Sequence, residues 1–434
     1  MKILDSNKKN FYKDLDKIIN KRKTIDKSTL RIVEKIISRV RRNEDKALIY
    51  YEKKFNSNTK IVSSKKEISR AIKLLDPKIK RAIDETCKRV RDWHLKQKPK
   101  DIFYKDKLNN KFYYKNKSIG SVACYVPGNL PSTLIMCATP AIIAGVKRIV
   151  LCTPSLNGKL NSAVYYAASK LGIKEFYNLG GASAIAALAM GTPKVKAVDK
   201  IVGPGSKWVA LAKKKVFLEG LCGIEAANMG PSEILCIADS SSDPEIIASS
   251  CIAQNEHSSD SMSILLTKDK KLIKKVQLSI IEQMKDLPRK KIAGSSFKKN
   301  SLFIYVSNDK TIISIVNHIA PEHIEISTKN YKKYLKSNII AGSVCIGPYS
   351  SMALSDYGPT QHSLPTHSSA KFSSGLSVKD FLIQTSYNEL SKKGVAKLGK
   401  SGYLMSNFEN LVGHSRSIKK KNGETINWQK KKIS

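Results

Sequence analysis

EILCIADSSSDPEIIASSCIAQNEHSSDSMSILLT, residues 233–267, contains two short apolar runs separated by a segment with helical spacing. The runs at 233–239 and 262–267 have the length and apolar content of buried strands. Between them, Asp243 and Pro244 form a strong helix start, because aspartate caps a first turn and proline has its φ preset for the first helical position. The stretch therefore predicts a strand, a helix and a second strand.

The same alternation continues on both sides of this stretch. Earlier strands are expected in GSVACYV, KRIVLCTP, EFYNLG and DKIVGPG, and later ones in LFIYVS, HIEIST and GSVCIG. Residues 1–100 and the chain after about 376 have the pattern of amphipathic helices instead. Strands that alternate with helices imply parallel sheets. The predicted fold class is α/β, with two incomplete Rossmann-like parallel-sheet domains plus helical N- and C-terminal extensions.

The chain has 434 residues, enough for two or three packed domains. We expect two α/β units of similar size between a helical N-terminal part and a helical C-terminal part.

The charge balance is strongly basic, with a formal net charge of +41. This raises the hypothesis of nucleic-acid binding. Lysine supplies 65 of the 77 basic residues, whereas arginine is preferred for bidentate reading of bases and phosphates. The lysines are also spread along the chain, and no helix-turn-helix, RRM or zinc-finger spacing occurs. We therefore expect a lysine-rich surface and no specific nucleic-acid partner.

The sequence contains neither a signal-peptide core near its start nor an apolar stretch long enough to span a bilayer. Its eight cysteines form no CxxC pair, which argues against a thiolate zinc site. Most of them lie in apolar runs, where cysteine behaves as a small hydrophobic residue. A cytoplasmic protein without a membrane partner is expected.

Gln254 and His257 lie at the end of the helix predicted after Asp243. Gln254 shares a face with Ile247 and Cys251, and a polar side chain on an apolar face needs a partner. One interpretation is a hydrogen-bonded glutamine followed by a capping histidine. The other is a pair of metal ligands, which would need further ligands from elsewhere in the chain.

Two glycine-rich turns precede predicted helices, LGGAS at 179–183 and GPGS at 203–206. Both can present backbone N–H groups and a helix N-terminus to a phosphate. Neither has the GxGxxG spacing of a dinucleotide fingerprint. The glycines are equally compatible with tight strand-to-helix turns that bind nothing.

Six of the seven histidines follow residue 250. His323 adjoins Glu322 in APEHIEI, and glutamate beside histidine suits proton transfer. Asp356, His362 and His367 occur in LSDYGPTQHSLPTH, a turn-rich segment of the kind in which functional side chains concentrate. His414 follows Glu409 in NFENLVGHS. Each residue alone is more often structural than catalytic.

Taken together, these segments resemble the histidinol dehydrogenase family. The resemblance is carried in order by YVPG, ATPAIIAGV, GPSE, AQNEHSSDS, APEHIEI, DYGPTQHSLPT and the Glu409–His414 spacing, and it extends from about residue 25 to 420. It implies an N-terminal helical arm over 1–24 and a zinc-binding catalytic α/β domain built from 25–117 and 229–375. It also implies an NAD-binding Rossmann-like domain over 118–228, and a C-terminal helical arm over 376–434 that completes the active site of a homodimer partner.

The resemblance also implies residue roles. The zinc ligands, one ion per subunit, would be Gln254, His257, Asp356 and His414, and the acid–base pair Glu322 and His323. Ser232, His362 and Glu409 would help to hold the substrate, together with the four ligands and His323. Tyr125, Ser183 and Ser206 would line the NAD site.

The implied reaction is the oxidation of L-histidinol through L-histidinal to L-histidine with two NAD. Several positions depart from the family pattern. Ser183 stands where the family usually has Gln, and Ser206 where it has Asn. The loop after YVPG is shorter, IEAANMGPSE replaces the usual ID…PAGPSE, and Gln361 replaces Asn in a segment one residue short. A paralogue that oxidises another small polar alcohol, such as a sulfonated diol, is the alternative, and a basic nucleic-acid-binding protein on the same fold ranks third.

Overall fold

The structure is a computed structural model that describes residues 1–23, 27–155, 157–225, 230–358 and 363–423. The chain divides into two compact units. We call Met1–Lys98 with Ile119–Phe381 the main unit, and Pro99–Ser118 with Leu382–Ser434 the arm unit.

The main unit contains a six-stranded sheet in which every pair of neighbouring strands is parallel. In spatial order the strands are β1 (Lys2–Asp5), β11 (Leu302–Tyr305), β10 (Met262–Thr267), β9 (Glu233–Ala238), β12 (His323–Ser327) and β13 (Ser343–Ile346).

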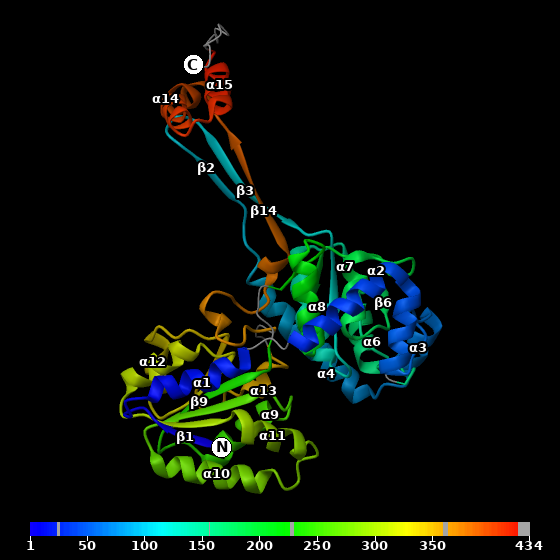
Figure 1. Ribbon diagram of the computed structural model, residues 1–434, viewed down its shortest axis with the longest axis vertical. Coiled ribbons are helices and arrows are strands. Elements are labelled where there is room, and N and C mark those ends of the chain that lie inside the picture. The colour runs from blue at the N-terminus through cyan, green and yellow to red at the C-terminus, as the bar shows by residue number, and fades with distance from the viewer. Residues whose placement is uncertain (24–26, 156, 226–229, 359–362, 424–434) are drawn as a thin grey trace. The chain divides into compact units, whose positions relative to one another are not determined.

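Helices cover both faces of this sheet (Figure 1). On one face, α1 (Phe11–Lys23) and α12 (Asp309–Ile319) pack on alternate strand residues such as Leu235 and Ile324. On the other face lie α9 (Pro244–Asn255), α10 (Lys270–Gln283) and α11 (Lys290–Asn300). Both faces are apolar because each is buried, as expected for parallel strands.

The main unit also contains a five-stranded parallel sheet. In spatial order the strands are β6 (Glu175–Tyr177), β5 (Arg148–Cys152), β4 (Ser121–Tyr125), β7 (Lys200–Val202) and β8 (Gly223–Ile224). One face packs against α2 (Lys27–Asn56), α7 (Gly181–Met190) and α8 (Lys207–Leu218).

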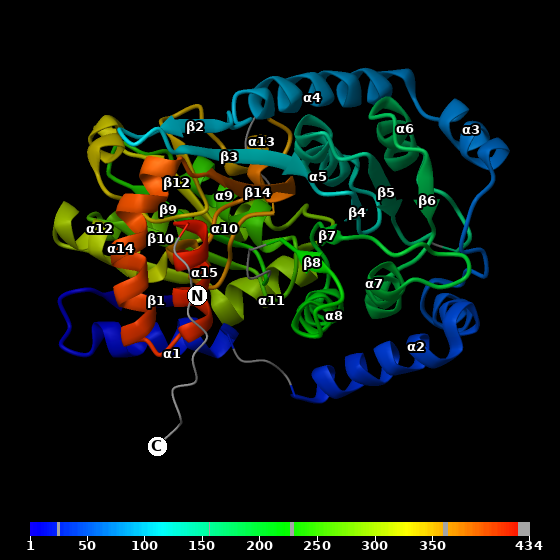
Figure 2. The same cartoon turned by 90° about the horizontal axis from the view of Figure 1, so that it is seen from above.

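The other face of this sheet packs against α5 (Pro131–Ala144). Beside α5 lies α6 (Ser162–Lys170), whose Tyr165 packs on Phe176 of β6. Against these helices pack α3 (Lys65–Lys73) and α4 (Pro77–Leu95). Figure 2 shows α4 running along α5 and α6, with α2 on the opposite side beside α7. Shorter helices of the main unit are α13 (Met352–Ser355) and the 3₁₀ turns Tyr331–Lys336, Ser369–Lys371 and Val378–Phe381.

The two parallel sheets share one topology. Numbered by their own order in sequence, β4–β8 lie in the order 3-2-1-4-5, and so do β9–β13. A full Rossmann sheet continues to a sixth strand, so both sheets are incomplete versions of that fold. The predicted α/β class with two Rossmann-like sheets is confirmed.

The arm unit is a three-stranded antiparallel sheet followed by two helices (Figure 1). The strands lie in the order β14 (Leu382–Glu389), β3 (Lys111–Ser118) and β2 (Ile102–Lys105), and the helices are α14 (Lys392–Phe408) and α15 (Val412–Lys421). Helices were expected over the whole of 376–434, and that was wrong for 382–389. Its IQTSY core is rich in β-branched and aromatic residues, which suit a strand with a partner.

Two further differences concern the N-terminal half. Residues 1–24 were expected to be helical, yet β1 precedes α1 and extends the six-stranded sheet. Residues 25–117 were expected to group with 229–375, whereas α2 packs on the five-stranded sheet and 99–118 belong to the arm unit. An amphipathic sequence pattern indicates that a helix covers an apolar surface, but it does not specify which surface.

No described helix is both long and apolar enough to cross a membrane.

Candidate functional site

Glu322 and His323 lie where β12 begins. The Oε2 atom of Glu322 accepts a hydrogen bond of 2.8 Å from the backbone N–H of Glu233, the first residue of β9. Its Oε1 atom lies 3.8 Å from Nε2 of His323. The two side chains are only 12% and 7% exposed, so a carboxyl group and an imidazole share a nearly water-free position.

Ser232 lies at the same edge of the sheet. It precedes Glu233, and its carbonyl accepts a hydrogen bond of 3.0 Å from the N–H of Met262 at the start of β10. His323 pairs in register with Ile234 of β9. The amino ends of the central strands therefore bring Ser232, Glu322 and His323 to one edge, although their positions in the sequence are far apart.

Gln254 reaches this edge from a helix. Because α9 runs antiparallel to the strands it connects, its last turn lies at their amino ends. Gln254 is 1% exposed, and its Oε1 atom is buried without a hydrogen-bond partner among the described residues. His257 follows two residues beyond the helix and is exposed. A buried acceptor oxygen without a donor costs free energy, and a metal ion at this position would satisfy it.

Asp356 immediately follows the short helix α13, which packs against α9 and β12. It is half-buried. Three of the four predicted ligands, Gln254, His257 and Asp356, thus lie on or next to neighbouring elements of the main unit. Within the described ranges, no group of three His, Cys, Asp or Glu side chains gathers closely enough to hold a metal.

The remaining predicted residues belong to the arm unit or fall outside the described residues. His414 is exposed on α15 of the arm unit, and Glu409 is exposed at the end of α14. These two residues flank the turn between the helices. His362 lies outside the described residues, as does most of the segment around 226–229 that departs from the family pattern.

The predicted cofactor residues lie at the carboxyl edge of the five-stranded sheet. Tyr125 ends β4 and is buried, and its hydroxyl oxygen accepts a hydrogen bond of 3.1 Å from the N–H of Gly181. Ser183 is buried and donates to the carbonyl of Gly180 at 3.2 Å. Ser206 is exposed at the N-cap of α8, and its side chain makes no capping hydrogen bond.

The turn before α8 requires glycine at two positions. A Cβ atom on Gly203 would lie 2.2 Å from the carbonyl oxygen of Tyr125, and Gly203 has a φ of +113°. A Cβ atom on Gly205 would lie 2.4 Å from Cγ1 of Val209. This turn follows β7, which neighbours β4 at the point where the strand order reverses. Open α/β sheets bind ligands at the carboxyl ends of strands at such a point.

Three buried charged groups near these positions were not predicted. Glu52 of α2 is fully buried and accepts a hydrogen bond of 2.7 Å from the N–H of Gly180, and burial raises the pKa of its carboxyl group. Lys213 and Glu225 form a buried ion pair of 2.5 Å. Local sequence could not reveal them, because charged residues are mostly exposed and a buried one leaves no local pattern.

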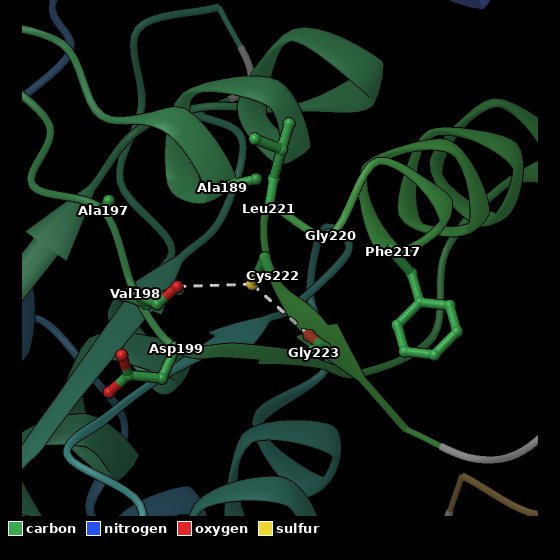
Figure 3. Close-up of a pocket in the computed structure, with 9 residues that line it drawn as sticks. All are labelled: Ala189, Ala197, Val198, Asp199, Phe217, Gly220, Leu221, Cys222 and Gly223. Carbon is green, nitrogen blue, oxygen red and sulfur yellow. Dashed lines mark hydrogen bonds between the residues drawn. The ribbon is translucent and has the colours of Figure 1, made fainter. Parts of the chain in front are cut away.

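A surface hollow of about 440 Å³ lies at the opposite, amino edge of the five-stranded sheet. Figure 3 shows Cys222 in its wall, with its thiol directed to the carbonyl oxygens of Val198 and Gly223, both at 3.3 Å. None of the predicted site residues lines this hollow. It is therefore separate from the candidate site.

Comparisons with known proteins agree with the resemblance seen in the sequence. Residues 19–422 match the family described as histidinol dehydrogenase. A histidinol dehydrogenase of Pelagibacter ubique is 51% identical over 425 residues, which cover 97% of this chain and 99% of that protein. Another, from Mesorhizobium japonicum, is 39% identical and covers 89% of this chain and 91% of its own length.

A solved structure shows the same similarity in three dimensions. The crystal structure of histidinol dehydrogenase from Elizabethkingia anophelis superposes with a TM-score of 0.90 at 32% identity. The match covers 97% of this chain and 98% of that one. The similarity therefore extends over both parallel sheets and the arm unit.

Proposed function

Because the chain belongs to the histidinol dehydrogenase family, we propose that it oxidises L-histidinol through L-histidinal to L-histidine with NAD as the hydride acceptor. The observation that carries this proposal is the pair of Glu322 and His323 at the start of β12, buried and anchored to β9. Two oxidations of one carbon require both a base for the alcohol and a group that activates water for the aldehyde.

In the first oxidation, His323 accepts the hydroxyl proton of histidinol as a hydride leaves the carbinol carbon for NAD. In the second, Glu322 removes a proton from a water molecule that adds to the aldehyde, and a second hydride leaves the resulting hydrate. Each turnover consumes two NAD and one water and releases three protons with the carboxylate product. The low exposure of both side chains places the two proton transfers where little bulk water reaches.

We assign the zinc ligands to Gln254, His257 and Asp356 of one chain and to His414 of a second copy. The buried, unpartnered Oε1 atom of Gln254 supports this assignment. When bound, zinc would hold the amino alcohol and the imidazole of the substrate in place as a template. Ser232 lies beside Glu322 through Glu233, and with His362 and Glu409 we assign it to substrate binding.

We assign the NAD site to Tyr125, Ser183 and Ser206 in the domain of 118–228. The supporting geometry is the glycine turn of Gly203 at the strand-order reversal and the N-terminus of α8 beside it. Backbone N–H groups at a helix N-terminus favour a pyrophosphate.

We propose that the C-terminal arm over 376–434 completes the active site of a second copy in a homodimer. The arm unit exposes large apolar side chains, among them Phe103 at 60% and Phe408 at 85%. Exposed apolar side chains of this size support an interaction surface on the arm unit. We place the activity in the cytoplasm, where the eight free thiols stay reduced.

The test is an assay of the purified dimer with NAD and either histidinol or a sulfonated diol. The expected result is two NADH formed per histidine from histidinol and a much lower kcat/KM with the diol. The reverse preference would assign the chain to the alternative substrate. Retention on DNA that persists at moderate salt, without any dehydrogenase activity, would favour the nucleic-acid alternative.

A further inference from the structure

Glu325 lies two residues after His323 on β12 and is only 2% exposed. Side chains alternate along a strand, so Glu325 and His323 project from the same face of the six-stranded sheet. Their register partners on β9, Ile234 and Cys236, belong to the apolar cluster that also contains Cys251 of α9. A carboxyl group in such a layer costs free energy unless it is hydrogen-bonded, and burial raises the pKa of Glu325.

Glu325 lies where three elements meet. Its Oε1 atom accepts a hydrogen bond of 2.5 Å from the N–H of Met352, the first residue of α13. The side chain of Ser250, on α9, lies close enough to lower the pKa of the carboxyl group, and α13 itself packs against α9. One buried carboxyl group of β12 is thus bonded to α13 beside α9.

Each connected element carries a residue of the candidate site. On α9, Ser250 lies one helical turn before Gln254, on the same face. On α13, Met352 accepts through its carbonyl a hydrogen bond of 3.3 Å from the N–H of Asp356. Because α13 has only four residues, a shift of Met352 would be transmitted directly to Asp356.

We propose that Glu325 is a positioning residue that sets the spacing between Gln254 and Asp356 by holding α13 against α9. This inference rests on the assignment of those two residues as zinc ligands. Glu325 itself touches neither substrate nor metal. Its loss should therefore weaken zinc binding while the acid–base pair remains in place.

The test measures the zinc dissociation constant of the full-length dimer in zinc-buffered solutions. Glu325→Met keeps the side-chain length but removes the acceptor of the Met352 N–H. We expect zinc binding to weaken about 10–100-fold, as is typical when a group that orients a ligand is lost. Glu325→Gln keeps an acceptor oxygen and should bind zinc nearly as tightly as the wild type.

Glu52→Met is the matched control. Glu52 is also a buried carboxyl group bonded to a backbone N–H, but it packs on the five-stranded sheet. It should lower the melting temperature without changing the zinc dissociation constant. Where Glu325→Met does not fold, Ser250→Ala removes the α9 hydroxyl group near Glu325 and should still weaken zinc binding measurably.

Folded Glu325→Met with wild-type zinc affinity would overturn the inference, as would an equal loss of affinity in Glu52→Met. If Glu325→Met does not fold, wild-type zinc affinity in Ser250→Ala would overturn the inference. Wild-type protein that binds no zinc would instead overturn the metal assignment under the proposed function, and this inference with it. The wild-type titration thus separates the two failures.

Discussion

The carboxylate of Glu322 is anchored by the backbone of Glu233, through a hydrogen bond of 2.8 Å to Oε2. Its second oxygen lies 3.8 Å from His323 Nε2, which is longer than a hydrogen bond. The two side chains are therefore close neighbours whose ring nitrogen and carboxyl oxygen lie beyond direct hydrogen-bond distance. We assign each of them a separate proton transfer.

Separate roles predict separate kinetic defects. Glu322→Gln should slow the oxidation of histidinal far more than that of histidinol, because the amide cannot take a proton from water. His323→Asn should slow the alcohol step by roughly 10²–10⁴-fold. Single-turnover rates starting from histidinol and from histidinal measure the two steps. Equal effects of both variants on both steps would contradict the assignment.

Removing a metal ligand should remove the metal. We expect the purified protein to hold about one zinc ion per chain. His257→Ala should abolish both zinc content and activity with little change in thermal unfolding of the zinc-free protein, since His257 is exposed.

His318→Ala is the control for zinc loss. His318 is hydrogen-bonded to Asp16 on another part of the main unit, at 2.6 Å. Metal analysis should find full zinc in this variant. Unchanged zinc in His257→Ala would reject the ligand assignment.

Cofactor affinity should respond to the length of residue 206. Ser206 lies at the N-cap of α8, is exposed and makes no capping hydrogen bond with its side chain. We expect Ser206→Asn to bind NAD more tightly, because the longer amide reaches further and adds a donor. Fluorescence titration of NAD measures the change, and zinc content should stay constant. Equal or weaker affinity would remove this explanation.

A composite active site predicts complementation between inactive variants. Co-refolded Glu322→Gln and His414→Ala should recover about a quarter of wild-type activity, since random pairing leaves one intact site in each mixed dimer. In the matched control, Glu322→Gln with His257→Ala, both defects lie in the main unit and no site becomes intact. No recovery in the first mixture would refute shared sites.

Burial of Glu52 predicts a pH-dependent cost to stability. Its pKa is raised in the folded state, chiefly by desolvation. The fold thus favours the neutral carboxyl group. The contribution of Glu52 to the free energy of unfolding is therefore fully present below the unfolded pKa, and it is lost as the pH rises through the folded pKa. Glu52→Gln cannot ionise and does not lose this contribution. The free energy of unfolding of the variant, relative to that of the wild type, should therefore increase as the pH rises.

Urea unfolding of both proteins between about pH 4 and pH 8 measures this difference. The glutamine retains an oxygen that can accept from the N–H of Gly180. A difference in unfolding free energy that stays constant over this range would show that Glu52 does not titrate as its burial indicates.

Local sequence was sufficient to predict those helices and strands that depend on residues close to one another in the chain. Asp243 and Pro244 begin α9 as predicted, and Asp243 accepts the expected capping hydrogen bond from Glu245. The alternation of apolar runs with helices predicted the nine strands β4–β7 and β9–β13. These features follow from side-chain periodicity and capping, which act over a few residues.

Contacts between distant segments decided the rest. Three features join segments that are far apart in sequence. They are the sheet that α2 covers, the pairing of β14 with β3 and the bond from Glu233 to Glu322. The burial of Glu325 belongs to the same group, because only the docking of α13 places a donor against it. Such contacts leave no local periodicity in the sequence. The free energy that selects them comes from tertiary packing between distant segments, which overrides local preference.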